Sequence, residues 1–435
     1  MESLASPPEL LMATMLAGIA FVLLLGALLA RLAGRLRQPA VIGEIVAGIL
    51  LGPSVLGHLP GNLPDRLFPA DVRPLLSAVA QVGLVLFMFL IGWEFEKRLL
   101  RPNKRVAVSV AVCSVGLAFS LGVALGAVLH ARHDEVAGQQ VPFAAFVMFM
   151  GAAMSVTAFP VLARILSDNR LTHTRVGALA LACAAVDDLL AWCLLAYVSA
   201  LVTARGAEDL ARIAVLSAGY IAVLVVLVRP LLAALVTRWA HAGQWNRLLV
   251  VLCAGAFLSA YATTWIGIHA VFGAFLFGFI MPSEPALSLA QHVHRPLEHI
   301  SVVLLPVFFI VTGLNVDIGG LRPPQMLELT AIIAVAVTGK LVGTILPTRL
   351  LGLPWRESLA LGLLMNTRGL TELIILNVAV TLGVLDQQMF TMMVIMALVT
   401  TTLAGPLLPR RDALAGDAPA ALPLPPPIVA QRAAS

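Results

Sequence analysis

Long apolar runs, separated by short polar or charged stretches, repeat along almost the whole chain. Most runs approach 20 residues, the length that an α-helix needs to cross a membrane, so each is expected to be one transmembrane helix. Runs bounded by charge, proline or glycine predict about thirteen such helices. Their expected spans are 9–30, 39–57, 73–93, 105–130, 142–166, 173–203, 211–235, 246–265, 267–283, 297–316, 326–348, 355–382 and 386–408. The pattern therefore predicts an all-α polytopic membrane protein.

The chain divides into two parts by composition. Residues 1–408 hold the apolar runs and form the expected transmembrane domain, whereas residues 409–435 are rich in proline and alanine. Such a stretch buries too little apolar surface to offset the entropy lost on ordering. It is therefore expected to be a disordered cytoplasmic tail.

Composition agrees with the apolar pattern and excludes a soluble globular protein. Hydrophobic residues make up 60% of the chain and charged residues only 12%, about half the charged share of a soluble protein. The net charge of +5 does not indicate a nucleic-acid partner, because the basic residues gather in loops on one side. The lipid bilayer is the expected partner instead. The apolar runs also contain all four cysteines, which are expected to be buried and unpaired: Cys113, Cys183, Cys193 and Cys253.

The distribution of lysine and arginine predicts the orientation. Nineteen of these 28 residues lie in or next to loops that follow odd-numbered runs, with Arg410 and Arg411 after the last run included. Because cytoplasmic loops carry the excess of positive charge, we expect a multi-pass protein of the cell membrane, typical of a bacterial inner membrane. Its N-terminus lies outside and its C-terminus in the cytoplasm. We name the opposite side the arginine-poor face; it holds Arg66, Arg73, Arg132, Arg205, Arg212 and Arg322.

Two runs contain helix-breaking or polar residues near their centres. The run at 142–166 contains Phe159 and Pro160, and proline both lacks a backbone N–H and clashes with the preceding helical turn. Interrupted helices at corresponding places in two halves of a chain are typical of a transporter site. The alternative interpretation of the two interruptions is a proline kink in one helix and a polar packing patch in the other. The second interrupted run, at 355–382, contains Asn366, Thr367 and Gly369.

We place six charged residues inside the apolar layer of the membrane, away from the ends of the runs. Each costs roughly 2.5–3.5 kcal/mol at the middle of a bilayer, so six unpaired charges cost on the order of 15 kcal/mol, as much as the net stability of a protein. They are therefore expected to face one another or a water-filled cavity. The six are Glu44, Asp187, Asp188, Lys340, Arg368 and Glu372.

Asp187 and Asp188 are adjacent on one expected helix, and adjacent helical residues point about 100° apart. One carboxylate is therefore expected to face a cavity and the other a neighbouring helix, where Lys340 is the expected partner. A buried Asp–Lys pair can exchange protons as a unit. Oxygen ligands from Asp188, Ser155 or Thr157 suit a small monovalent cation, which is a hard ion. No cofactor and no metal other than this cation is expected.

Arg368 and Glu372 are expected to offset the partial charges of the broken helices. Half-helix N-termini are positive and C-termini negative, so Glu372 suits the former and Arg368 the latter. A plain i,i+4 ion pair is the simpler alternative. Glu44 is expected to cap a helix or pair near the membrane surface. A solvated loop, rather than a metal site, is expected for His292, His294 and His299.

Six segments together resemble the membrane domain of the second cation:proton antiporter family, which includes NapA-type and Kef-type proteins and the plant CHX exchangers. The resemblance covers roughly residues 38–382. In chain order the segments are "QPAVIGEIVAGILLGPSVLG", "SVTAFPVLARIL", "AVDDLLAW", "GAFLFGFIMP", "PVFFIVTGLNVDI" and "MNTRGLTELIILN".

This resemblance implies an NhaA/NapA-like fold with inverted repeats, two crossed broken helices and a homodimer. It implies exchange of Na⁺ and/or K⁺ for H⁺ by elevator-type alternating access. Carried to this sequence, Asp188 matches the cation-binding carboxylate, and Asp187 matches the carboxylate that alternates between a proton and a salt bridge with Lys340. Ser155 and Thr157 fall where the family lines its site.

One departure concerns Glu372, which stands two positions further along than in the many relatives that read Arg-Gly-Glu. The pairing of Asp187 with Lys340 resembles the electrogenic members.

Other functions are possible for such a chain. A membrane aspartyl protease needs two carboxylates on one water, which adjacent helical residues do not provide, so no enzyme is expected. A closed, salt-bridged acid pair between broken helices fits the open pore of a channel poorly. A transport-inactive sensor or scaffold needs none of the costly buried charges. A transporter of a different small substrate on the same fold also stays open, and the residues do not separate Na⁺ from K⁺.

Overall fold

The structure is a computed structural model that describes residues 8–36, 38–60, 63–94, 104–136, 138–169, 171, 174–204, 206–282 and 286–408. Among these residues, twelve helical segments are long and apolar enough to cross a membrane. The described part holds one small sheet, the antiparallel hairpin of β1 (Glu135–Val136) and β2 (Gln139–Gln140). The all-α polytopic membrane fold expected from the sequence is therefore confirmed. The tail expected at 409–435 lies outside the described residues.

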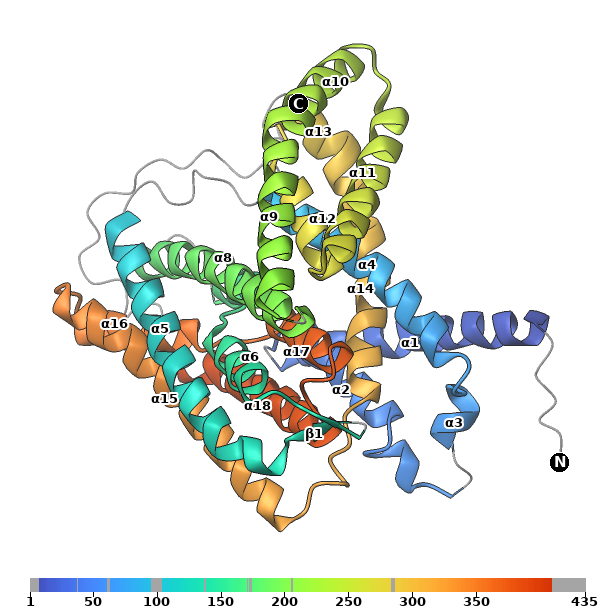
Figure 1. The fold of residues 1–435 in the computed structure, drawn as a ribbon. Coiled ribbons are helices and arrows are strands. Elements are labelled where there is room, and N and C mark those ends of the chain that lie inside the picture. Colours follow the sequence, from blue (N-terminus) through green and yellow to red (C-terminus); the bar gives the residue numbers. More distant parts are fainter. Residues whose placement is uncertain are drawn as a thin grey trace.

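The helices pack in two groups, which Figure 1 shows as a bundle at the lower left and a set of helices above it and to its right. The bundle, which we call the core, is formed by two stretches of chain that are far apart in sequence. Packing of α5 against both α6 and α15 joins these stretches. The core helices are α5 (Lys104–Leu129), α6 (Phe143–Ser155), α7 (Phe159–Asp168), α8 (Arg175–Thr203), α15 (Pro323–Leu350), α16 (Trp355–Met365), α17 (Leu370–Thr381) and α18 (Gln387–Leu407).

The second group, which we call the scaffold, packs around α4 and α14. Its helices are α1 (Pro8–Arg35), α2 (Ala40–Leu51), α4 (Arg73–Glu94), α9 (Ala207–Val223), α10 (Arg229–His241), α11 (Trp245–Ile266), α12 (Ala270–Phe279) and α14 (Arg295–Leu314). Short helical turns complete it at α3 (Leu63–Leu67), α13 (Ala286–Leu289), η1 (Leu56–His58) and η4 (Ala290–His294).

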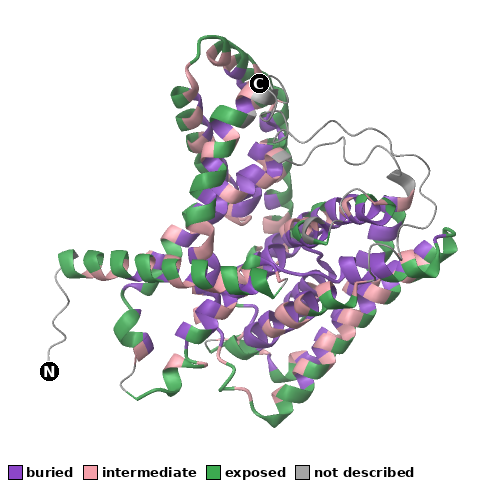
Figure 2. Cartoon of the chain, turned by 180° about the vertical axis from the view of Figure 1, so that it is seen from behind, coloured by how far each residue is buried: buried purple, intermediate pink, exposed green. Residues whose placement is uncertain are grey.

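Burial is concentrated where the core helices meet (Figure 2). The broken helix of α16 and α17 is the most completely buried of the twelve spans, whereas α1 and the α9–α10 segment are the least buried. Their exposed side chains include large apolar residues such as Leu24, Val226 and Leu231. Apolar surface of this kind is expected to face lipid or another membrane helix.

Two scaffold helices differ from the sequence expectation. The run at 211–235 belongs to a longer helical segment, 207–241, in which the π-helical turn η3 (Leu224–Val228) joins α9 to α10 just before Pro230. The helix expected at 267–283 is shorter, Ala270–Phe279, because Gly267 ends α11 with a positive φ and His269 caps α12. The ring of His292 stacks on Trp245 at 4.5 Å, so the chain after α12 returns to the end where α11 begins.

The cysteines were expected to be buried, and for two of them this was wrong. Cys183 is buried and Cys253 half-buried, but Cys113 and Cys193 are exposed on the surfaces of their helices. A cysteine in an apolar run can equally well lie on a lipid-facing side, because composition alone does not reveal which side of a helix packs.

Candidate site at two crossed broken helices

The first broken helix consists of α6 and α7, joined by the non-helical residues 156–158. Pro160 is the second residue of α7 rather than a kink within a continuous helix. The N–H groups of a first turn have no helical partner, so proline costs little there and fixes a helical φ. The break expected from Phe159 and Pro160 therefore lies just before them.

The second broken helix consists of α16 and α17, joined by residues 366–369. Asn366 ends α16 and Gly369 precedes α17. A Cβ atom on Gly369 would lie 2.7 Å from Cγ2 of Val161 in α7, so only glycine allows the two helices to approach this closely. The hydroxyl of Thr401 in α18 contacts both the N–H and the C=O of Arg368 at 2.8 Å and fixes the backbone of the break.

The two breaks are hydrogen-bonded to each other. The N–H of Ala158 donates to the carbonyl of Thr367 at 3.1 Å, and the hydroxyl of Thr157 donates to the carbonyl of Met365 at 2.6 Å. The Ser155 hydroxyl donates to Ala152 within α6 at 2.8 Å. Both hydroxyls thus use their protons on backbone carbonyls, and their oxygen lone pairs remain as acceptors. Backbone groups freed by the breaks are satisfied in the same way.

Arg368 lies at the C-terminal end of α6. Its guanidinium donates to the carbonyls of Ala153 at 2.8 Å and Met154 at 2.7 Å, and also to Glu372 at 3.2 Å. The side chains of Arg368 and Glu372 are fully buried. A cation at the carbonyl end of a helix is electrostatically favourable. The geometry thus contains both arrangements weighed from the sequence, the contact with a helix end and the i,i+4 ion pair.

Asp187 and Lys340 form a fully buried salt bridge, with Nζ and Oδ2 2.8 Å apart. Two glycines bring α15 close to α5 around the lysine: a Cβ on Gly339 would lie 3.0 Å from Cα of Ala118, and one on Gly343 would lie 2.9 Å from Cα of Ser114. Small residues four apart permit this close packing of membrane helices. The pairing of the single lysine of the apolar runs with one aspartate follows the sequence expectation.

Asp188 points to a different set of neighbours, as the angle between adjacent helical residues requires. The hydroxyl of Thr371 lies 3.4 Å from Oδ1 of Asp188, and the backbone amide of Phe159 is a second neighbour of the same carboxylate. Phe159 begins α7, and Thr371 is in the first turn of α17. The Asp188 carboxylate therefore faces the positive N-terminal ends of both second half-helices, a favourable place for an anion.

Thr371 was not expected at the site from the sequence. It stands three residues after Arg368 in a chain with many threonines in its apolar runs, and nothing in its own pattern marks it. The only available signal was its place in the first turn after a break, corresponding to that of Phe159 in the first broken helix.

The acid pair is closed off in this conformation. Asp187 is fully buried and Asp188 is 4% exposed, so neither carboxylate lies on an open surface. Three buried side-chain oxygens at the site have no hydrogen-bond partner among the described residues: Oδ1 of Asp187, Oδ1 of Asn366 and Oε2 of Glu372. Unpaired acceptor oxygens in a closed, buried place can receive a proton or a dehydrated cation.

Other residues considered from the sequence lie elsewhere. Glu44 is half-buried on α2, which packs against α1 and α14 rather than against the acid pair. His292 and His294 contact the tryptophans Trp245 and Trp93. Among the described residues, no group of three or more His, Cys, Asp or Glu side chains has a metal-binding arrangement.

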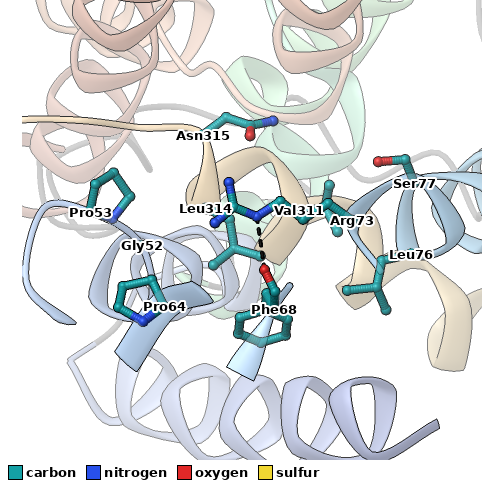
Figure 3. A pocket seen from close by; sticks show the side chains of 10 residues that line it. All are labelled: Gly52, Pro53, Pro64, Phe68, Arg73, Leu76, Ser77, Val311, Leu314 and Asn315. Carbon is teal, nitrogen blue, oxygen red and sulfur yellow. Dashed lines mark hydrogen bonds between the residues drawn. The ribbon is translucent and has the colours of Figure 1, made fainter. Parts of the chain in front are cut away.

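A cavity of about 50 Å³ lies between α2, α4 and α14, away from the acid pair. Figure 3 shows its lining, in which the guanidinium of Arg73 donates to the carbonyl of Phe68. It has room for a few water molecules.

Comparison with known proteins identifies one family and several similar antiporters. The family described as "Sodium/hydrogen exchanger, transmembrane" matches residues 19–410. The chain is 41% identical over 395 residues to the Na⁺/H⁺ antiporter NhaS4 of Synechocystis, covering 90% of this chain and 95% of that protein. It is 38% identical over 406 residues to cation/H⁺ antiporter 17 of Arabidopsis thaliana, covering 92% of this chain and 49% of that protein. The chain thus spans about half the length of this plant relative.

A solved structure shares the fold. The sodium proton antiporter MjNhaP1 of Methanocaldococcus jannaschii aligns with a TM-score of 0.63 at 16% identity, over 92% of this chain and 96% of that one. At this level of identity, the similarity is evidence for the fold alone.

Proposed function

This chain belongs to the sodium/hydrogen exchanger family, and we propose that it is a secondary active antiporter that exchanges Na⁺ or K⁺ for H⁺. The relatives are named as antiporters, so the chain is a transporter and not an enzyme. One observation carries the proposal: a buried Asp187–Lys340 salt bridge adjoins a second buried carboxylate, Asp188, at the crossing of two broken helices.

Protons and the cation compete for the two aspartates. Asp188 binds the cation as a carboxylate, and the lone pairs of Ser155 and Thr157 serve as further oxygen ligands. Asp187 holds either a proton or the salt bridge with Lys340. Because the cation binds only after protons leave, and protons rebind only after it departs, each direction of transport requires the other. This competition couples the two fluxes without a separate conformational signal.

The helix ends make the closed site possible. The N-terminal ends of α7 and α17 face Asp188, while Arg368 lies against the negative end of α6. These partial charges are fixed by the backbone, so they compensate a buried carboxylate before the cation arrives and after it leaves. Arg368 and Glu372 thus stabilise the broken helices rather than bind the cation.

The division into core and scaffold supports alternating access. The crossed helices, the acid pair and Lys340 all belong to the core, so the core can carry the site as one body past the scaffold. The burial of both aspartates supports such a mechanism, since a site that is shielded from water on both sides suits alternating access. The core then exposes Asp188 to one side of the membrane at a time, as in an elevator.

A homodimer and a cell-membrane location complete the proposal. The exposed apolar faces of α1 and of the α9–α10 segment supply surface for a second copy in the membrane. The excess of arginine on one side supports an N-terminus outside and a C-terminus in the cytoplasm. Crosslinking of single cysteines on α9 in native membranes would test the dimer.

Cation-induced dequenching of a pH dye in energised vesicles tests the exchange. Addition of Na⁺ or K⁺ is expected to release the pH gradient for the wild type. Asp188→Asn is expected to abolish this response, whereas Asp209→Asn, which changes a partly exposed carboxylate on α9, keeps it. Proton-coupled flux that persists in folded Asp188→Asn protein would refute the assignment of the site. No response of the wild type to either ion would favour another small substrate or a transport-inactive sensor.

A further inference from the structure

Four charged residues meet at the arginine-poor end of the core, in what we call the His133 cluster: Arg132, His133, Glu328 and Asp386. The Nδ1 atom of His133 lies 2.6 Å from Oδ2 of Asp386, and its Nε2 atom lies 3.1 Å from Oε2 of Glu328. Arg132 contacts the other oxygen of Glu328 at 2.6 Å. His133 is only 2% exposed and Glu328 5%, so the imidazole is shielded from water.

The arrangement fits a protonated imidazole. A neutral imidazole carries one N–H, whereas a carboxylate only accepts hydrogen bonds, so only imidazolium can donate to both carboxylates. Burial by itself lowers the pKa of His133, but the hydrogen bonds and charges of Asp386 and Glu328 outweigh this and raise the pKa above its ordinary value of 6.5. With imidazolium the four charges cancel, and after deprotonation one negative charge is left uncompensated.

The cluster joins three separate parts of the core. His133 follows α5 and the short turn η2 (His130–Arg132), Glu328 lies in the second turn of α15, and Asp386 caps α18 by accepting the N–H of Met389 at 2.6 Å. Lys340 stands twelve residues after Glu328 on α15, about 18 Å along the same helix. The helices that the cluster ties together thus include the one that brings Lys340 to Asp187.

Few other polar groups from the surrounding elements face the imidazole. From α6, Phe146 places its ring parallel to it at 6.4 Å. From α15 and α18, the amides of Gln325 and Gln388 bond to each other beside the cluster. The neighbouring His130 contacts the carbonyl of Val141 at 3.0 Å, and no carboxylate contact is found for it in the described part of the chain. Asp134 and Glu135 follow on the same loop, half-exposed and exposed respectively.

We propose that the His133 cluster is a second proton-binding site, separate from the transport site, which links the ends of α5, α15 and α18 when protonated and makes exchange respond to the pH at the arginine-poor face. Deprotonation leaves one carboxylate contact without a donor and loosens the end of α15. Exchange then declines as the pH on that face rises, because Lys340 is less firmly positioned.

Thermal unfolding against pH tests the proton site without any transport. The protonated contact stabilises the fold fully below about pH 6.5, the ordinary pKa of histidine, and its contribution is lost as pH rises through the raised pKa of His133. The wild type should therefore show a fall in melting temperature over that range. His133→Gln should lack this step, whereas His130→Gln, its matched control on the same turn, should keep it. A step that persists in His133→Gln would overturn the proton site.

Exchange in oriented proteoliposomes tests the regulatory part, which rests on the proposed function. The pH is varied on one face at a time, with the cation gradient held constant. The wild type and His130→Gln should lose activity as the pH at the arginine-poor face rises, and His133→Gln should not show this dependence. Asp386→Asn, which keeps a capping oxygen for α18 but removes the charge, should behave like His133→Gln. Unchanged pH dependence in both variants, or dependence on the opposite face, would refute the regulatory role. Failure of exchange in the wild type would instead refute the proposed function, and the unfolding measurement would still stand.

Discussion

The buried ion pair of Asp187 and Lys340 makes a strong prediction about double variants. Both side chains are fully buried and their charged atoms are 2.8 Å apart. Replacement of one partner leaves an uncompensated charge in the interior, which costs about 3–5 kcal/mol, whereas replacement of the whole pair by neutral groups is often nearly neutral. Lys340→Met and Asp187→Asn should therefore each lower the free energy of unfolding by about 3–5 kcal/mol. The double variant should lose less than either single variant.

Thermal unfolding in detergent at one fixed scan rate measures this coupling. An exposed pair of nearly equal length, Arg73 with Asp65 at 2.7 Å, serves as the control. The coupling between Arg73→Met and Asp65→Asn in their double variant should be less than about 1 kcal/mol, because water screens the two charges. A fall in the melting temperature of the Lys340→Met/Asp187→Asn double variant equal to the sum of both single effects would refute the buried ion pair.

Three further variants test how the site is held. Gly343→Ala should destabilise the protein and weaken exchange, because the new Cβ would lie 2.9 Å from Cα of Ser114; Gly116→Ala, where no atom lies within 4 Å, should be neutral or stabilising by up to about 1 kcal/mol, as melting temperatures would show. Arg368→Gln should lower stability by about 3–5 kcal/mol, because it leaves a buried carboxylate without its cation, and a melting temperature close to that of wild type would contradict this. Thr371→Val should raise the apparent KM for the cation by up to about tenfold, the equivalent of one weak charged hydrogen bond, with recovery in Thr371→Ser; equal KM values for Val and Ser would argue against the hydroxyl.

The features that could be predicted from the sequence are those whose absence would cost much free energy. An unpaired charge in a bilayer is so unfavourable that the only lysine of the apolar runs was expected to form a salt bridge with an acidic residue. In the structure, Lys340 forms this salt bridge with Asp187. Proline and glycine both disfavour a continuous helix, so the breaks near Pro160 and Gly369 could also be predicted from the sequence. The inverted repeats of the two halves stay a prediction.

Features that depend on packing between distant segments could not be predicted. The donation of Thr157 to Met365 and the approach of Thr371 to Asp188 arise only after the two broken helices cross. The His133 cluster unites residues from three loops and helix ends, where charged residues are common and usually solvated. The predicted length of α12 was wrong because one turn residue, Gly267, determines where the preceding helix ends.

The central claim is that protons and the cation compete for the same pair of carboxylates. Proton release on cation binding tests it most directly: Na⁺ or K⁺ is added to purified protein in weakly buffered detergent solution, and the pH change is recorded. The wild type is predicted to release protons at saturable cation concentrations, Asp209→Asn to behave like it, and Asp188→Asn to release none. Saturable cation binding by the wild type without proton release, or equal release by Asp188→Asn, would contradict competition at the acid pair.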